Sequence, residues 1–448
     1  MSELAAPGNP LDGKIRSLGE KDIQKILEVF REKLDASAAA GLYSCVHCGL
    51  CADSCHYYLA TGEPEAMPAA KLDLVNRVFK RYHSLIGRRL PQLAGASILS
   101  REMVRAWVDS LFGRCTLCGR CSLSCTMGIP IFSLIRTARS ALAAVGLVPP
   151  GLQATVDTAI RSGNNMGISM ANWLETVAWL EEELQNEVGD PRLRLPIDRR
   201  GARILYAINP REAMFFPLSI SAAGKIFYAA DEDWTFSSAN FDVTNYGLYN
   251  GDDEAAGVMS GRLLEAMERL GCRELVLAEC GHGFNSNRWE APEWLRRKQD
   301  VRVRSILEVV AEYIREGSIR LDPARNAKLH TLHDPCNLVR LGGIVEEQRY
   351  ILKRAAGNFI EMRPSREKNY CCGGGGGQLA MTNFAGRRLE AGKIKARQIE
   401  ATGARVVATP CHNCIDQLME LNKQYKLGVE IRTVCEIAAD ALVIGPKS

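Results

Sequence analysis

The sequence predicts a multidomain α+β protein, in which a helical, cysteine-rich N-terminal part is followed by two related α/β halves. Three observations support this class. The first 150 residues contain two runs of four cysteines among helix-like stretches. From Gly201 onward, short β-branched runs alternate with helical ones. That later pattern recurs at a spacing of about 125 residues, and 448 residues are enough for two or three domains.

The composition excludes several classes of protein. With 46% hydrophobic and 24% charged residues the chain is globular rather than disordered, and a net charge of +4 is too small to indicate nucleic-acid binding. No window holds the roughly 18–20 apolar residues of a membrane-spanning helix. The first residues, MSELAAPGNPLDGK, lack the features of a secretion signal. We therefore expect a cytoplasmic protein without a transmembrane segment of its own, whose clustered cysteines bind metal rather than form disulfides.

Changes of pattern divide the chain into five predicted segments. These are an N-terminal helical extension (1–40), a helical cysteine-rich domain (41–150), a helical connector (151–200) and two α/β halves (201–325 and 326–448).

The extension contains an amphipathic helix, because its apolar residues recur at helical spacing. They are Ile23, Ile26, Leu27, Phe30 and Leu34. We expect this stripe to pack either on the rest of the chain or on a partner subunit. In the connector, residues 173–187 predict a second, acidic helix.

Short β-branched runs predict strands in both α/β halves, at 202–208, 273–278, 328–333 and 405–408. A helix is predicted from Ser305, which forms a capping box with Glu308. The internal repeat aligns Arg203–Pro210 with Lys328–Pro335, Asn245–Gly247 with Asn369–Cys371, and Leu275–Cys280 with Val406–Cys411, at offsets of 125, 124 and 131 residues. Two related halves of about 120 residues are the simplest explanation.

Thirteen of the 16 cysteines fall into three constellations, and the first two share the spacing C-x-x-C-x-x-C-x-x-x-C. This is the spacing with which bacterial ferredoxins bind [4Fe–4S] cubanes, the fourth cysteine of each run binding the other cluster. By that rule one cubane is bound by Cys45, Cys48, Cys51 and Cys125, and the other by Cys115, Cys118, Cys121 and Cys55. The alternative is a pair of structural zinc sites, which usually take two separated C-x-x-C pairs rather than one run of four.

The third constellation consists of Cys336, Cys371, Cys372, Cys411 and Cys414, with five glycines (373–377) directly after the adjacent pair. Neighbouring side chains of an extended chain point in opposite directions, so both can face one cluster only where the chain bends. Glycine allows that bend. It also lets the backbone N–H groups of residues such as Gly373 and Gly374 approach a cofactor and donate to its sulfur atoms.

The motif HDPC…NYCCGGGGG…TPCHNC resembles that of the CCG-domain iron–sulfur family. With the two cubane runs, the chain from about Gly41 to its end is similar to the D subunit of heterodisulfide reductase. The resemblance implies that the five cysteines bind a noncubane [4Fe–4S] cluster that cleaves disulfides. His412, between Cys411 and Cys414, is then a candidate proton donor to a leaving thiolate, or a residue that only supports packing.

The first α/β half departs from this motif. Of the five cysteines it keeps Cys280, while Arg211, Gly247 and Gly283 stand where Cys336, Cys371 and Cys414 would align. We therefore expect one noncubane cluster, in the second half. Two cubanes with one intact motif are similar to the K subunit of the Dsr complex and the B subunit of the Tmc complex of sulfate-reducing bacteria. That similarity implies a cytochrome b-like membrane partner, other redox subunits and a peripheral position on the cytoplasmic face of the inner membrane.

Two functions remain open from the sequence. In the first, the chain is the catalytic subunit of an anaerobic respiratory complex, a heterodisulfide reductase-like thiol:disulfide oxidoreductase. Electrons pass through two cubanes to the noncubane cluster, which reduces or forms a disulfide of a small molecule or protein. In the second, the chain only transfers electrons, as do the iron–sulfur subunits of glycolate oxidase and anaerobic glycerol-3-phosphate dehydrogenase.

A zinc scaffold at Cys411 and Cys414 is disfavoured by the five matched cysteines. Cys272 and Cys435, outside all three constellations, are expected to be buried apolar groups.

Overall fold

The computed structural model describes residues 9–296 and 301–444, which fold as two compact units. The first unit combines the chain up to Ala154 with residues 246–253 and 370–395, and the second contains residues 155–245, 254–369 and 396 onward. Each unit is therefore discontinuous in sequence, whereas the five predicted segments are contiguous. Residues 1–8 of the predicted extension lie outside the described residues.

Helices and loops build the first unit. Its elements are α1 (Asp12–Ser17), α2 (Glu20–Glu32), α3 (Ala36–Ser44), η1 (Ala52–Ser54), α4 (His56–Thr61), η2 (Pro64–Ala66), α5 (Pro68–His83), α6 (Leu85–Arg89), α7 (Pro91–Ala94), α8 (Arg101–Trp107), η3 (Val108–Phe112), α9 (Arg120–Leu123), α10 (Ile131–Ala143), α15 (Gly247–Asn250), η7 (Thr382–Phe384) and α22 (Ala385–Ala391). Helices α11 (Pro150–Ser162), α16 (Asp253–Leu270) and α23 (Lys393–Glu400) pass from one unit to the other.

The amphipathic stripe predicted at the N-terminus lies on α2. Its central residues Ile26 and Phe30 are fully buried, because α2 packs against α10 of the same unit. The Phe30 ring also lies 5.6 Å from the ring of Trp107. Of the two partners predicted for the stripe, the structure therefore gives the chain itself.

The second unit contains all the strands of the described chain. Its elements are α12 (Met170–Val188), β1 (Ile204–Ala207), α13 (Pro210–Phe215), α14 (Pro217–Ala230), β2 (Trp234–Thr235), β3 (Glu274–Leu277), α17 (Gly281–Asn285), η4 (Ser286–Glu290), α18 (Ala291–Trp294), β4 (Arg302–Ser305), α19 (Ile306–Glu316), η5 (Pro323–Asn326), β5 (Leu329–Leu332), α20 (Cys336–Val339), α21 (Glu347–Ala355), β6 (Asn358–Glu361), η6 (Arg366–Lys368), β7 (Val406–Ala408), α24 (His412–Tyr425), β8 (Glu430–Arg432) and α25 (Val434–Ala441). The predicted mixture of helix and sheet is confirmed, as is the capping box of Ser305 and Glu308 at the start of α19.

The strands form two parallel four-stranded sheets with corresponding orders, β2-β1-β3-β4 and β6-β5-β7-β8. In each sheet the two central strands pair directly, with Ile204 opposite Glu274 in the first and His330 opposite Val406 in the second. The four predicted strands are these central ones, since buried parallel strands read as continuous apolar runs. The sequence did not predict the four outer strands, β2, β4, β6 and β8.

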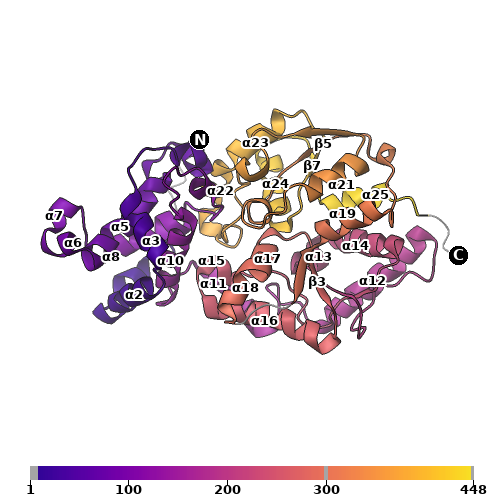
Figure 1. Ribbon diagram of the computed structural model, residues 1–448, viewed down its shortest axis with the longest axis horizontal. Helices are drawn as coiled ribbons and strands as arrows, with labels where there is room; N and C mark the ends of the chain where they lie inside the picture. The colour runs from indigo at the N-terminus through magenta and orange to yellow at the C-terminus, as the bar shows by residue number, and fades with distance from the viewer. Residues whose placement is uncertain (1–8, 297–300, 445–448) are drawn as a thin grey trace. The chain divides into compact units, whose positions relative to one another are not determined.

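One apolar core joins the two sheets within the second unit. It runs from β1 and β3 through α14 and α19 to α21 and α25, with Ile226, Val310, Ile351 and Ile437 fully buried. Helix α14 packs on α25 and α19 packs on α21. Figure 1 shows these helices between the labelled strand β3 of one sheet and β5 and β7 of the other. Across residues 9–296 and 301–444, no helix combines the length and hydropathy of a membrane-spanning segment.

Candidate metal centres

Three cysteines of the third constellation lie at one edge of the second sheet. Strands β5 and β7 are parallel neighbours, and the loops after their carboxyl ends lead to Cys336 and Cys411. Cys336 is the first residue of α20, Cys411 caps the N-terminus of α24, and Cys414 follows in the first turn of α24. All three thiols are buried. The carboxyl edge of an open parallel sheet is where such folds bind ligands.

Hydrogen-bond donors surround these thiols. The Cys414 thiol and backbone N–H groups, including that of Gly281, donate to Cys411 and hold the pKa of its thiol below the ordinary value despite burial. The side-chain amide of Asn337 lies 3.6 Å from the Cys336 sulfur. Because the thiolate is the form that binds a metal, this edge suits an iron ligand set.

The adjacent pair Cys371 and Cys372 belongs to the first unit, and both thiols are buried. The backbone N–H of Gly373 lies 3.4 Å from the Cys371 sulfur, and that of Gly374 lies 3.4 Å from the Cys372 sulfur. Gly373 has a φ of 105°, which side chains of L-residues rarely allow. The chain therefore bends directly after the pair, and its N–H donors reach both candidate ligand atoms.

The glycine run rests on the loop that carries Cys115. A Cβ atom on Gly376 would lie 2.5 Å from the carbonyl carbon of Thr116, so a larger residue cannot take this position without moving the backbone. The side-chain amide of Gln378 also donates to the carbonyl oxygens of Phe112 and Cys115. The loop of the adjacent pair and the loop of the second cysteine run are therefore packed together within the first unit.

A buried arginine also connects these two loops. Arg139 of α10 is completely buried and donates to the carbonyl oxygens of Cys115 at 2.8 Å and Gly376 at 2.9 Å. Its remaining N–H groups donate to the carbonyls of Leu111 and Tyr249. Burial lowers the pKa of Arg139 to about 10, so the guanidinium is still charged at neutral pH.

Two hollows in the first unit are each lined by four cysteines from the first two runs. One is lined by Cys45, Cys48, Cys51 and Cys125, and the other by Cys55, Cys115, Cys118 and Cys121. This grouping exchanges the fourth cysteine of each run, as the ferredoxin rule does. Four thiols around one largely apolar hollow fit a cubane cluster.

A buried ammonium group compensates charge at the second hollow. The Lys71 side chain is buried, donates to the carbonyls of Ala66 and Arg114 at 2.7 and 2.6 Å, and lies 4.0 Å from the Cys55 sulfur. Burial raises the pKa of the Cys115 thiol, and the Lys71 charge opposes that rise. Lys71 thus favours the thiolate form that an iron–sulfur cluster requires.

His412, the candidate proton donor, is buried between the two halves of the second unit. Its Nδ1 lies 3.1 Å from the Glu279 carbonyl oxygen, and its Nε2 lies 3.0 Å from the Ser219 hydroxyl. Burial lowers its pKa to about 3, so the ring is neutral at physiological pH. Both ring nitrogens thus contact groups of the first half, an arrangement typical of a residue that supports packing.

The first half arranges the equivalent edge differently. The Cys280 thiol is buried, with the Asn209 side-chain amide 3.6 Å away and the His282 Nδ1 3.5 Å away. Arg211 forms an ion pair of 2.5 Å with Asp416 of α24. At this edge Cys280 and Arg211 thus make hydrogen bonds and an ion pair.

A cysteine could not be accommodated at Gly283 of the first half. A Cβ atom there would lie 2.5 Å from the Val243 carbonyl oxygen and 3.1 Å from the Cys280 sulfur. Cys272 and Cys435, as predicted, are buried.

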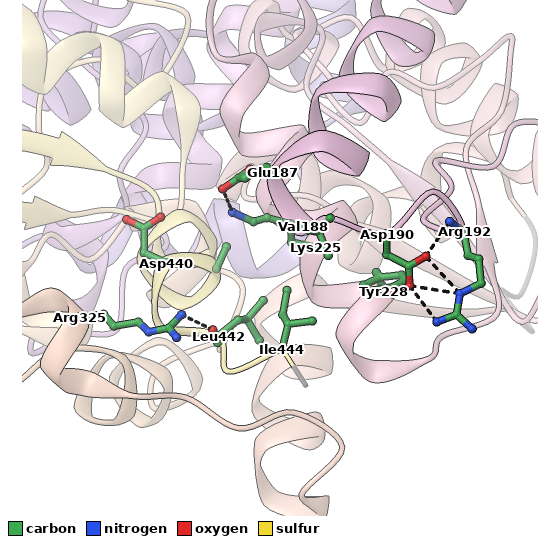
Figure 2. Close-up of a pocket in the computed structure, with 12 residues that line it drawn as sticks. Glu187, Val188, Asp190, Arg192, Lys225, Tyr228, Arg325, Asp440, Leu442 and Ile444 are labelled. Carbon is green, nitrogen blue, oxygen red and sulfur yellow. Dashed lines mark hydrogen bonds and ion pairs between the residues drawn. The ribbon is translucent and has the colours of Figure 1, made fainter. Parts of the chain in front are cut away.

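A surface cavity of about 770 Å³ lies elsewhere on the second unit, and Figure 2 shows the side chains that line it. Lys225 pairs with Glu187, and Arg192 pairs with Asp190. None of the described residues that line it is a cysteine or a histidine. Four of its charged side chains are thus paired within the lining, and the cavity provides no metal ligands of the kind found at the cysteine sites.

Two family models match parts of the chain. Residues 41–129 match a 4Fe-4S dicluster domain, and residues 330–419 match a cysteine-rich domain named CCG. The chain is 30% identical to the Hdr-like menaquinol oxidoreductase iron-sulfur subunit 2 of Archaeoglobus fulgidus, over 93% of this chain and 83% of that protein. The chain belongs to this family of Hdr-like oxidoreductase iron–sulfur subunits.

Other relatives agree with this membership. The D subunit of the dihydromethanophenazine:CoB--CoM heterodisulfide reductase of Methanosarcina barkeri is 25% identical over 92% of this chain and 96% of its own length. The EtfAB:quinone oxidoreductase of Syntrophomonas wolfei is 23% identical over 85% of this chain and 55% of its own length. The predicted resemblance to the D subunit of heterodisulfide reductase is confirmed, and the chain is an iron–sulfur subunit of an oxidoreductase.

Sequence reasoning missed the basic residues around the cysteines. Arg139 lies among Ile135, Ala138 and Leu142 on the apolar face of α10, where an arginine needs buried acceptors. An arginine on an otherwise apolar helix face was the sequence signal that could have identified this buried residue. Lys71 is likewise buried on α5, beside Leu72 and Val75.

Proposed function

We propose that the chain carries electrons between two cubane [4Fe–4S] clusters and a noncubane [4Fe–4S] cluster that reduces or forms a disulfide. In this role it is the heterodisulfide reductase-like thiol:disulfide oxidoreductase subunit of an anaerobic respiratory complex. The observation that carries the proposal is the direct packing of the Cys371–Cys372 loop on the Cys115 loop, with Arg139 bonded to both. Two redox sites built on adjoining loops of one compact unit are suited to electron exchange.

The proposed ligands of the cubanes are the two sets of four cysteines that line the hollows. Those of the noncubane cluster are Cys336, Cys371, Cys372, Cys411 and Cys414. When bound, the cubanes supply one-electron steps and the noncubane cluster supplies an iron that accepts a substrate sulfur. The chain's own groups place the ligands, and the N–H groups of Gly373 and Gly374 donate to the sulfur atoms of the adjacent pair.

Two cations act on the second cubane site. Arg139 and Lys71 are both buried, and each bonds to backbone carbonyls next to a candidate ligand. Positive charge close to a cluster stabilises its reduced, more negative state, and hydrogen bonds to the cluster surroundings have the same effect. We propose that these residues favour electron residence at the cubane next to the adjacent pair.

We further propose that the two sheets are internal repeats. Their strand orders correspond, and the aligned positions Arg211 and Cys336 follow equivalent strands, as do Cys280 and Cys411. The second repeat holds the noncubane cluster, and the first has lost its ligands.

The names of the relatives support a proposal about partners. The names of two relatives include the words menaquinol and dihydromethanophenazine. We propose that this chain works with other redox subunits and a cytochrome b-like membrane subunit, on the cytoplasmic face of the inner membrane. Its disulfide substrate is a small molecule or a small protein.

The names of some relatives favour a second function, electron transfer without disulfide chemistry. The relatives named menaquinol oxidoreductase subunit and EtfAB:quinone oxidoreductase are described by a quinone reaction rather than by a disulfide. In that alternative the chain only transfers electrons, as in subunits of flavin dehydrogenases of the glycolate oxidase or anaerobic glycerol-3-phosphate dehydrogenase type.

The deciding experiment compares electron acceptors with the anaerobically purified chain. We expect about twelve iron atoms per chain, as two cubanes and one four-iron cluster imply, and no stoichiometric zinc. The dithionite-reduced protein should be reoxidised by a disulfide, and Cys336→Ala should lose this reaction while retaining the cubane EPR signals. Reoxidation by a menaquinone analogue alone would establish the electron-transfer function instead.

Arg139→Met tests the observation on which the proposal rests. Since residues that support a metal site typically change its behaviour by 10- to 100-fold, we expect electron exchange between the cubanes and the noncubane cluster to slow by roughly that factor. The potential of the second cubane should also fall, which redox-titrated EPR measures. The matched control is Arg136→Met, one turn earlier on α10, because Arg136 pairs with Asp253 instead of the cluster loops. Equal rates and potentials in the two variants would contradict the role of Arg139.

A further inference from the structure

Five large aliphatic side chains are exposed together around the short helices α6 and α7. They are Leu85, Ile86, Leu90, Leu93 and Ile98, and they are between 54% and 82% exposed. We call this group the apolar tip. Helices α6 and α7 follow the end of α5, and within the first unit Figure 1 shows them on the far side of α5 from α10. An exposed apolar group of this kind marks an interaction surface.

Specific contacts hold the apolar tip in a defined conformation. Gly87 approaches the end of α5 so closely that a Cβ atom would lie 2.0 Å from the Lys80 carbonyl oxygen. Ser84 caps the N-terminus of α6, and the Arg88 guanidinium donates to the Tyr82 carbonyl at 2.8 Å. These contacts fix α6 with Leu85 and Ile86 facing solvent, so their exposure is a stable property of the fold.

The segment of chain that carries the apolar tip has charges of one sign only. Residues 74–101 contain six Lys or Arg residues and no Asp or Glu. Of these, Arg88 and Arg89 are exposed on α6 itself, next to the aliphatic side chains. A cationic segment of this kind attracts an anionic surface, at about 1 kcal/mol for each basic residue close to a membrane.

We infer that the apolar tip inserts into the headgroup region of an anionic lipid bilayer. Protein interfaces draw their binding energy mainly from Trp, Tyr and Arg, with Leu under-represented, whereas the tip offers five aliphatic side chains. Amphipathic segments with a basic polar side and a Leu- or Ile-rich apolar side bind at the bilayer interface. This contact adds to the proposed membrane partner and does not depend on the chemistry of the clusters.

The test uses the full, cluster-loaded chain in flotation with two kinds of vesicle. One contains phosphatidylcholine only, and the other also contains phosphatidylglycerol. We expect binding to the anionic vesicles that weakens with salt. Replacing Leu85, Ile86 and Leu93 together by Ser should weaken binding by roughly 100-fold, because each removes an inserted apolar side chain. Arg89→Glu should weaken binding to anionic vesicles by roughly tenfold and leave binding to neutral vesicles unchanged.

The control variant is Leu218→Ser, since Leu218 of α14 is similarly exposed but far from α6 in the sequence. It should bind like the wild type, and unchanged cubane EPR signals confirm that each variant is folded. Failure of the wild type to bind either vesicle would overturn the inference, as would equal binding by the triple variant. If the triple variant lost association only with membranes that contain a partner protein, the tip would be a protein-docking surface instead.

Discussion

The two halves of the second unit place similar loops at the edges of similar sheets and fill them with different chemistry. After β5 and β7 come Cys336 and Cys411, whereas after β1 and β3 come Arg211 and Cys280. Buried thiols surrounded by N–H donors characterise the second edge. In the first, burial raises the pKa of Glu279 to about 7 and that of Glu212 well above its usual range. One edge suits a metal ligand set, and the other suits buried, uncharged carboxyl groups.

Contacts of the first half also support the edge of the second half. The Gly281 N–H donates to Cys411, and the Glu279 carboxyl oxygens accept from the backbone N–H groups of Val434 and Cys435 at the start of α25. The backbone N–H of His412 also donates to the Glu279 carbonyl at 3.1 Å. The first half thus contacts Cys411, His412 and the start of α25, and it helps to hold these parts of the second half in place.

The largest expected effect separates the two equivalent cysteines. Cys411→Ala should abolish the noncubane signal, because Cys411 is a proposed ligand, while the cubane signals persist on their separate cysteines. Cys280→Ala should retain all three clusters, because its half lacks the other ligands. EPR and iron content of the two variants measure this. Loss of a cluster in Cys280→Ala would show that the first edge is not degenerate.

A smaller effect is expected when a ligand is returned to the first half. Gly283→Cys should gain no iron and should lose about 1–3 kcal/mol of unfolding free energy, since its Cβ would lie 2.5 Å from the Val243 carbonyl oxygen. The control is Gly261→Cys on α16, where a Cβ would meet only the Leu295 side chain, at 3.5 Å. Thermal unfolding and iron analysis measure the pair. A stable Gly283→Cys protein with additional iron would contradict this account of the first edge.

Another predicted effect concerns a buried carboxyl of the first half. Burial raises the pKa of Asp242 from 3.8 to about 7, although Thr244 and Asn165 donate hydrogen bonds to it. Between these two pH values the folded chain binds more protons than the unfolded chain, so this group lowers the unfolding free energy as pH rises, up to about pH 7. Above that range its contribution is constant.

Asp242→Asn should therefore flatten the dependence of stability on pH between about 4 and 7. Asp157→Asn, at an exposed position, is the control and should leave the slope unchanged. Denaturant unfolding at several pH values measures both. If the unfolding free energy changed equally with pH in the wild type and in Asp242→Asn, Asp242 would not be the cause of this pH dependence.

The sequence predicted the central strands of both sheets and missed the outer ones for a physical reason. Residues of β1 and β3 are buried throughout, so their apolar runs are visible in sequence. The outer strands β6 and β8 mix polar and apolar residues over three or four positions and are partly exposed. Such short edges depend on a neighbouring strand, which no local pattern reveals.

The candidate sites were predictable to the extent that they depend on cysteine spacing. The spacing predicted the proposed cubane ligands, because cluster chemistry demands particular residues at particular separations. The resemblance to the CCG family implied the proposed noncubane ligands, and the glycine run predicted the bend at Gly373. None of these signals placed residues 370–395 in the same compact unit as the cubane loops. That arrangement depends on long-range contacts, such as those of Arg139 and Gln378, which join segments more than 200 residues apart in the sequence.

The most direct test of the central claim is EPR of the oxidised, cluster-loaded protein titrated with thiols, including a small protein with C-terminal cysteines. We predict that thiol changes the signal of the noncubane cluster in the oxidised protein, while the cubane signals, recorded after dithionite reduction, stay unchanged. Cys280→Ala should respond like the wild type, and Cys336→Ala should not respond. If no thiol or disulfide altered the noncubane signal while a quinone reoxidised the protein at full rate, disulfide chemistry at the second edge would be contradicted.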